Sequence, residues 1–253
     1  MLKIDLNCDM GESTTLWNYR IEKDIALLRY LSSVNLACGF HAGDAHTMHA
    51  LVEAALTAGL AIGALPGFPD KENFGRSNMT LPPEKIYDII IYQLGALDAF
   101  VKICGARLHH VKPHGALYNM AAKDRVMADA ICRAVKDYDE RLCLYGLSGS
   151  ELVKAAQAID LRSRSEVFAD RTYAPDGSLT PRSDPHAMIA SEEASLQQVI
   201  QMVQTGTVTA TNGKHVPLIA ETICIHGDGE HALPFAQRIY DTLKQQGIET
   251  RPD

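Results

Sequence analysis

Seven short apolar runs alternate with longer segments of helical periodicity along the whole chain, and this order restricts the fold more than any other feature. The segments between the runs repeat their apolar residues every three to four positions, and several begin at Asp, Ser or Pro and end at Gly, as helix capping predicts. Strands that alternate with helices form parallel sheets. We therefore predict a single α/β domain over residues 1–253, a seven-stranded parallel β/α barrel, with an open doubly wound sheet as the alternative. The runs are LKIDLN, SVNLACG, LAIGAL, LHHVKP, LCLYGL, EVFAD and TICIHG.

The composition excludes several classes of protein. A net charge of −7, with no basic run longer than a pair, argues against a nucleic-acid surface. No window approaches the 18 apolar residues of a membrane span, and the N-terminal sequence lacks the pattern of a signal peptide, so we expect no membrane contact and a cytoplasmic protein. The six cysteines are scattered without a C-x-x-C pair, which gives no support to a zinc ribbon or a redox dithiol.

The most informative motif is RLHHVKPHGALYN, in which His110, Lys112 and His114 occupy every second position. Side chains two apart share one face of a strand, and Pro113 and Gly115 mark where the strand ends. The carboxyl ends of strands are where α/β proteins hold their active sites. A buried lysine beside two imidazoles is expected to have a lowered pKa, so Lys112 could act as a base or as a cation for an oxyanion. Lys112 and His114 are therefore catalytic candidates, with His110 supporting them.

The first strand carries a second polar row, Asp5, Asn7 and Asp9, where a buried parallel strand is normally apolar throughout. The row predicts carboxylates that point into the barrel mouth, able to hold a metal or to transfer protons. Glu12, in the following turn, could join them. The alternative is a solvated edge strand.

The second strand contributes Asn35 and then His41, in CGFHAGD, on a glycine-rich bend. Asp44 is expected to cap the next helix. His46 and His49, three residues apart on that helix, are expected to form an ordinary helix surface rather than a metal site.

Two long loops, 66–83 and 170–187, are predicted to form walls or lids of a site. Arg76, Arg171 and Arg182 lie in or next to them, and each guanidinium is suited to a carboxylate or phosphate, although a solvated surface arginine is the alternative for Arg76.

The sixth strand places Glu166 and Asp170 on one face. Four residues along a strand separate them too far to share a proton, so each carboxylate needs its own partner, and Lys112 or Arg171 would fit.

The last strand ends in ICIHGDGEHAL, with His226 and Asp228 on one face. Gly227 and Gly229 belong to a G-x-G-x-x-A spacing that could expose backbone N–H groups to a phosphate, which alone is little evidence. The sequence has no P-loop, G-x-S-x-G or H-E-x-x-H motif. A nucleotide would therefore be bound by an unusual site or by a partner chain.

Six ordered blocks resemble the signature of the LamB/YcsF (lactam utilisation) family: DLNCDMGE, VNLACGFHAGD, PGFPDKENFGRS, VKPHGALYN, EVFADRTY with PRS, and ICIHGDGEHAL. The resemblance implies a seven-stranded barrel similar to polysaccharide-deacetylase and glycoside-hydrolase barrels. It also implies cleavage of 5-oxoproline to L-glutamate with ATP as co-substrate, together with 5-oxoprolinase subunits B and C. One departure is Leu65, where the family usually has a histidine in a G-A-H-P block.

The resulting hypothesis is an ATP-hydrolysing 5-oxoprolinase subunit whose site gathers at the carboxyl ends of the strands. The substrate is held by Lys112 or Arg171, while His114 and Asp170 position and deprotonate water. A bound divalent metal is possible but not assigned, with Asp9, His41 and His114 as candidate ligands, and a homo-oligomer is possible. Two alternatives are a stand-alone metal-dependent amidase or deacetylase and a non-catalytic lactam-binding subunit. The predicted catalytic residues are Asp9, His41, Lys112, His114, Asp170 and His226; the predicted substrate ligands are Asn7, Asn35, Arg76, Arg171 and Arg182.

Overall fold

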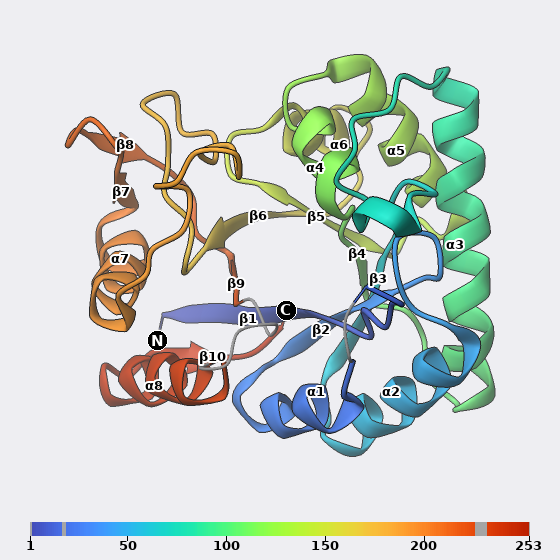
Figure 1. The fold of residues 1–253 in the computed structure, drawn as a ribbon, viewed down its shortest axis with the longest axis horizontal. Helices are drawn as coiled ribbons and strands as arrows, with labels where there is room; N and C mark the ends of the chain where they lie inside the picture. The colour runs from blue at the N-terminus through green and yellow to red at the C-terminus, as the bar shows by residue number, and fades with distance from the viewer. Residues whose placement is uncertain (1, 17–18, 226–231, 253) are drawn as a thin grey trace.

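Seven parallel strands close into a barrel in the computed structural model, which describes residues 2–16, 19–225 and 232–252 (Figure 1). The order around the ring is β1-β2-β3-β4-β5-β6-β9, and β9 pairs back onto β1. Each strand overlaps one of the seven apolar runs, so the predicted barrel is confirmed and the open sheet is wrong. The strands are β1 (Lys3–Met10), β2 (Ser33–Ala37), β3 (Ala61–Leu65), β4 (His110–Val111), β5 (Cys143–Leu147), β6 (Ser163–Phe168) and β9 (Thr222–Cys224).

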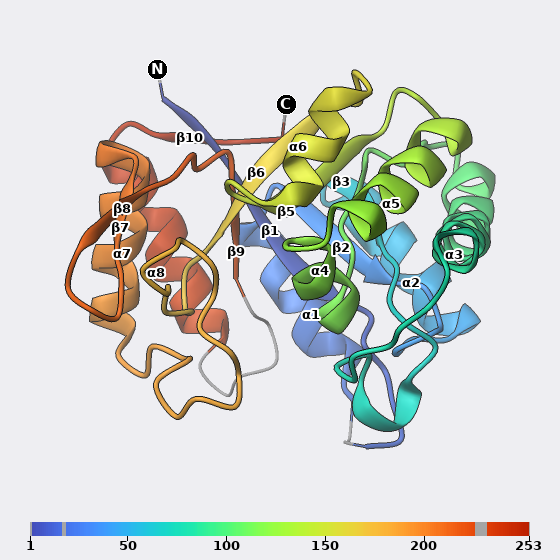
Figure 2. The same ribbon diagram turned by 90° about the horizontal axis from the view of Figure 1, so that it is seen from above.

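Helices surround this ring on its outside (Figures 1 and 2). They are α1 (Ile21–Leu27), α2 (Ala45–Thr57), α3 (Pro83–Ile103), α4 (Gly115–Ala121), α5 (Arg125–Tyr138), α6 (Glu151–Ala158), α7 (Glu192–Thr205) and α8 (Ala232–Gln245), with short 3-10 turns η1 (Leu28–Tyr30) and η2 (Lys71–Asn73). Within the described ranges, every helix is too short or too polar to span a membrane.

The two faces of β1 explain why its sequence alternates. Ile4, Leu6 and Met10 are buried in the hydrophobic core. Asp5 faces the barrel interior, where its carboxylate accepts three hydrogen bonds from hydroxyl groups. The donors are Ser32, just before β2, at 2.6 Å, Ser33 of β2 at 2.8 Å and Thr222 of β9 at 2.6 Å. The polar row is therefore an interior row, and the solvated edge strand is wrong.

Helix capping follows the predicted pattern at several helices. The Asp44 carboxylate accepts a hydrogen bond from the Thr47 backbone N–H at 3.0 Å, which confirms the expected cap of α2. Asp124, Ser150 and Ser191 cap α5, α6 and α7 in the same way, and Pro83 opens α3. These caps fix where the loops that follow the carboxyl ends of the strands give way to helices.

Some short elements were not predicted. They are α4, the antiparallel pair β7 (Thr207–Thr209) and β8 (His215–Pro217), and β10 (Glu249–Thr250), which adds in parallel to the start of β1. Each is too short to show a hydrophobic period in the sequence.

The two long loops lie at the same end of the barrel, the end toward which β1 runs (Figure 2). The first contains η2, and the second is folded on itself by bridges that pair Arg171 with Met188 and Tyr173 with Leu179. Both are ordered walls around the carboxyl ends of the strands.

Candidate active site

A pocket of about 710 Å³ opens among these loops at the carboxyl end of the barrel. Acidic groups enter it from the β1 end, basic groups from the β4 end and both long loops, and an aromatic side chain from α4. The polar residues among its lining include Asp9, Glu12, Arg76, Lys112, His114, Tyr118, Arg171 and Arg182. The predicted gathering of ionisable side chains at strand ends therefore holds for this set.

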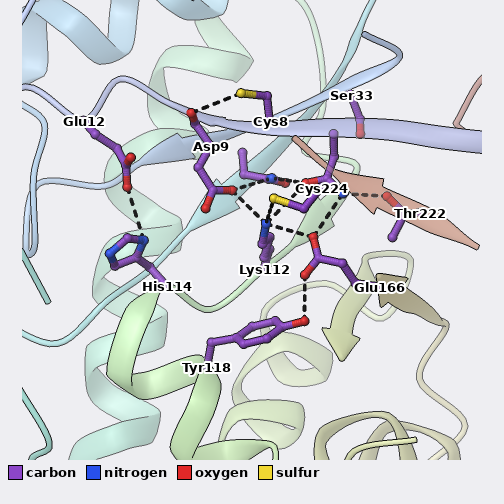
Figure 3. Close-up of polar contacts among 12 residues, drawn as sticks. Cys8, Asp9, Glu12, Ser33, Lys112, His114, Tyr118, Glu166, Thr222 and Cys224 are labelled. Carbon is purple, nitrogen blue, oxygen red and sulfur yellow. Dashed lines mark hydrogen bonds and ion pairs between the residues drawn. The ribbon is translucent and has the colours of Figure 1, made fainter. Parts of the chain in front are cut away.

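Lys112 lies at the floor of the pocket between two carboxylates (Figure 3). Its Nζ is 2.9 Å from Asp9 Oδ1 and 2.8 Å from Glu166 Oε1, and it donates to Cys224 Sγ at 3.1 Å. Burial alone would lower the pKa of Lys112, but these neighbours outweigh it and hold that pKa well above its ordinary value. The expected lowered pKa is wrong, because carboxylates rather than charged imidazoles surround the ammonium. Lys112 is therefore positively charged near neutral pH.

Glu166 is held from two sides. Its other oxygen, Oε2, accepts a hydrogen bond of 2.7 Å from the Tyr118 hydroxyl, so the carboxylate bridges Lys112 and Tyr118. Burial raises the pKa of Glu166 and the Lys112 ammonium opposes that rise. Tyr118 was not predicted as a site residue, because the seven-residue α4 that positions it has too few positions to reveal a buried face.

A chain of amides and one imidazole fills the barrel beneath Lys112. His110 Nε2 lies 2.7 Å from Asn35 Oδ1, and since an amide oxygen only accepts, this ring nitrogen carries the proton. Asn35 Nδ2 donates in turn to Asn7 Oδ1 at 2.7 Å and Asp9 Oδ1 at 2.8 Å. Burial holds the pKa of His110 well below its ordinary value, so the ring is neutral. His110 thus lies beneath Lys112 and connects to Asp9 through Asn35, while its supporting role stays a prediction.

The two predicted histidines His41 and His114 lie stacked, with ring centroids 3.8 Å apart and planes 6° from parallel. His41 Nε2 and His114 Nδ1 are each 3.2 Å from the same oxygen, Glu12 Oε1. His114 Nε2 lies 3.0 Å from the Phe74 carbonyl oxygen. Burial lowers the pKa of both histidines to about 3, which makes both rings neutral near pH 7.

The three arginines differ in what they hold. Arg76 and Arg182 line the pocket, and the Arg76 guanidinium lies 4.9 Å from the centroid of the Phe74 ring. Arg171 also lines the pocket, but it donates to the carbonyl oxygens of Thr180 at 2.6 Å and Ala187 at 3.2 Å. Arg171 therefore stabilises the second long loop.

Some predicted residues do not reach the pocket. Asp170 is not among its lining residues, and Asn7 and Asn35 are fully buried with their amides committed to the interior chain. Direct substrate contact by these two asparagines is therefore not supported by their position. His226, Gly227 and Gly229 lie outside the described residues.

Leu65, at the expected histidine position, is fully buried at the end of β3. It shares a strand face with Gly63, which lies against the His110 ring in the barrel interior. On α2, His46 is exposed and His49 partly exposed, as expected for a helix surface.

Comparison with known proteins places this barrel in a family. The model of the LamB/YcsF family matches residues 4–253. The chain belongs to the LamB/YcsF family. A curated relative from Tolumonas auensis, named as the A component of 5-oxoprolinase, is 54% identical over 251 residues, which cover 99% of each chain.

Solved structures show the same barrel. The crystal structure of a lactam utilization protein from Thermus thermophilus superposes with a TM-score of 0.91 at 43% identity and covers 99% of both chains. A family 4 carbohydrate esterase from Streptomyces lividans shares the barrel with a TM-score of 0.54 at 14% identity, over 98% of this chain and 91% of that one. The second likeness shows the fold alone.

Proposed function

We propose that this LamB/YcsF protein is the A component of an ATP-dependent 5-oxoprolinase, which cleaves 5-oxoproline to L-glutamate together with subunits B and C. The observation that carries the proposal is the 54% identity, over 99% of both chains, to a relative named as that component of 5-oxoprolinase.

The chemistry of the pocket suits this reaction. A five-membered lactam is a stable amide, so its hydrolysis gains from ATP, because phosphorylation of the lactam oxygen gives an activated imidate that water can attack. Lys112 offers a permanent positive charge at the pocket floor, where it can stabilise a developing oxyanion. Arg76 and Arg182 are the proposed partners of the substrate carboxylate, since guanidinium groups bind carboxylates in a bidentate manner.

The attacking water is proposed to lie beside His114 and Glu12, which border the same pocket. Asp170, predicted for the same role, is not among the lining residues, so Glu12 takes that place in this proposal. ATP enters as a co-substrate of the complex. A phosphate site at Gly227 and Gly229 stays a prediction, and the subunits B and C stay the proposed partners.

A coupled assay with purified B and C subunits tests the proposal. Glutamate release should depend on ATP and on this chain. It should fall at least about 100-fold, roughly 2.7 kcal/mol in the barrier, in Lys112→Ala and His114→Ala. Lys85→Ala and His49→Ala are the matched controls, because both side chains are on exposed or half-exposed helix surfaces, and both should retain activity. Release that survives the two site substitutions would contradict the site assignment.

The same assay separates the alternatives. Hydrolysis of an amide or acetyl substrate by this chain alone, without ATP, would favour the stand-alone amidase or deacetylase. Tight binding of 5-oxoproline with no turnover, even with B and C present, would favour a lactam-binding subunit.

A further inference from the structure

The stacked histidines and Glu12 form a compact set of donors at the edge of the pocket, outside the Lys112 cluster. Glu12 and His114 line the pocket, and His41 is fully buried behind them. These three groups approach from the turn after β1, the bend after β2 and the end of β4. Three potential ligand atoms, one from each side chain, all lie within 4.8 Å of one another.

Of the two ring nitrogens of His114, one has a hydrogen-bond partner among the described residues and the other does not. Because the Phe74 carbonyl can only accept, His114 Nε2 donates to it and is occupied by that contact. The other ring nitrogen, Nδ1, lies 3.2 Å from Glu12 Oε1. Among the described residues, the buried His114 Nδ1 has no hydrogen-bond partner. A cation or a proton between this nitrogen and the Glu12 oxygen would complete the contact.

The distances suit a small divalent cation. Ligand atoms about 2.0–2.1 Å from a tetrahedral zinc ion lie roughly 3.3–3.4 Å apart, and the two nitrogens are each 3.2 Å from the Glu12 oxygen. The Phe74 carbonyl fixes the ring of His114 through its other nitrogen, the usual arrangement for a metal-binding histidine.

Glycine backbones pack closely against the two histidines. A Cβ atom at Gly75, whose φ is +65°, would lie 2.7 Å from the His41 Cβ and 3.1 Å from His114 Cδ2. A Cβ atom at Gly67 would lie 2.7 Å from His41 Nδ1. The loop after β3 thus lies so close to both histidines that only glycine fits at these two positions.

We propose that Glu12, His41 and His114 bind one divalent cation of the zinc class, with the remaining coordination position open to the pocket. Two imidazoles and one carboxylate favour zinc, cobalt or nickel over magnesium, which prefers oxygen ligands alone. The parallel rings must turn about their Cβ–Cγ bonds to bring both lone pairs onto one ion. This site shares Glu12 and His114 with the proposed function, but cation binding is measured on the isolated chain, so the two proposals can fail separately.

Calorimetric titration of the EDTA-treated protein with Zn²⁺, and visible spectra with Co²⁺, test the proposal. We expect one ion per chain and a Co²⁺ absorption band. Affinity should fall at least about tenfold in Glu12→Gln and His114→Ala, since even outer residues of metal sites contribute about 10–100-fold. His49→Ala is the control, because His49, Glu53 and Cys104 form the other group of potential ligands among the described residues.

A second measurement covers variants that fold poorly. Zn²⁺ should raise the melting temperature of the wild type and of His49→Ala but not of Glu12→Gln, because only a ligand of the folded state stabilises it. No bound Zn²⁺ at tenfold excess over protein, retained affinity in both site variants, or loss of binding in His49→Ala would each overturn the proposal. If no Zn²⁺ binds, a shared proton instead of a cation links Glu12 and His114. None of these three outcomes changes how the coupled assay is interpreted.

Discussion

The Lys112 ammonium lies 2.8 Å from Glu166 Oε1, and both side chains are almost entirely closed off from solvent. Removing one partner of a buried ion pair leaves the other charge without compensation, which costs about 3–5 kcal/mol. We therefore expect Lys112→Met to lower the free energy of unfolding by about that amount in urea denaturation.

The double variant Lys112→Met with Glu166→Gln should recover part of this loss, because the stranded carboxylate is then neutral. A double variant as unstable as the sum of the two single ones would contradict a direct coupling between these side chains.

Gly63 gives a test of the packing beneath the pocket. A methyl group at Gly63 would overlap the His110 ring, so Gly63→Ala should destabilise the protein by about 1–3 kcal/mol in urea unfolding. Gly95→Ala, in the middle of α3 with open space around its Cα, is the matched control and should be neutral or stabilising by up to about 1 kcal/mol. Equal losses in both variants would show that His110 does not fill the space at Gly63.

The Asp44 cap predicts a pH dependence of stability. Slight burial opposes ionisation of Asp44, but hydrogen bonds from Thr47 and Ser13 outweigh it and lower its pKa to about 2. A carboxyl whose pKa is lower in the folded state contributes stability above its ordinary pKa, and that contribution disappears as the pH falls through about 2.

Asp44→Ala should therefore cost about 0.5–2 kcal/mol at pH 5, and the difference from the wild type should shrink at pH 2.5. Urea unfolding at the two pH values measures both. A difference that grows toward low pH would contradict the sign.

Leu65 gives a test of whether the site is complete without an imidazole from β3. The proposed cation ligands come from the ends of β1, β2 and β4, so Leu65→His should change Zn²⁺ affinity and coupled activity by less than about tenfold. Its unfolding free energy should fall by about 1–3 kcal/mol, because it buries a new polar group. Leu65→Met is the volume-matched control. A gain of more than about tenfold in Zn²⁺ affinity or in coupled activity for Leu65→His would make residue 65 part of the site.

The barrel and the positions of the strand-end groups could be predicted from the sequence, because alternation with a period of two assigns each side chain to a face. Asp5, Asn7 and Asp9 share the interior face for that reason, and His110 and Lys112 face them from β4. The direction in which the pKa of Lys112 shifts could not be predicted, because it depends on which residues of distant strands lie at the same level along the barrel axis.

Contacts that depend on the paths of loops could not be predicted from the sequence either. The stacking of His41 on His114 depends on the path of the loop after β3, where Gly67 and Gly75 approach the rings. Tyr118 reaches Glu166 from a helix of two turns, which carries no hydrophobic period. Spacing along the chain says little about such meetings, because they follow from tertiary packing.

Hydrogen bonds rather than apolar contacts connect the middle of this barrel, from Asp5 through Asn7 and Asn35 to His110. In an apolar core a neighbouring side chain can shift to accommodate a replacement. In this hydrogen-bonded row, by contrast, each side chain donates to or accepts from a specific partner, and only that partner can complete the bond. Divergence within the barrel should therefore proceed by paired replacements, and co-variation between these positions would be the signature of that constraint.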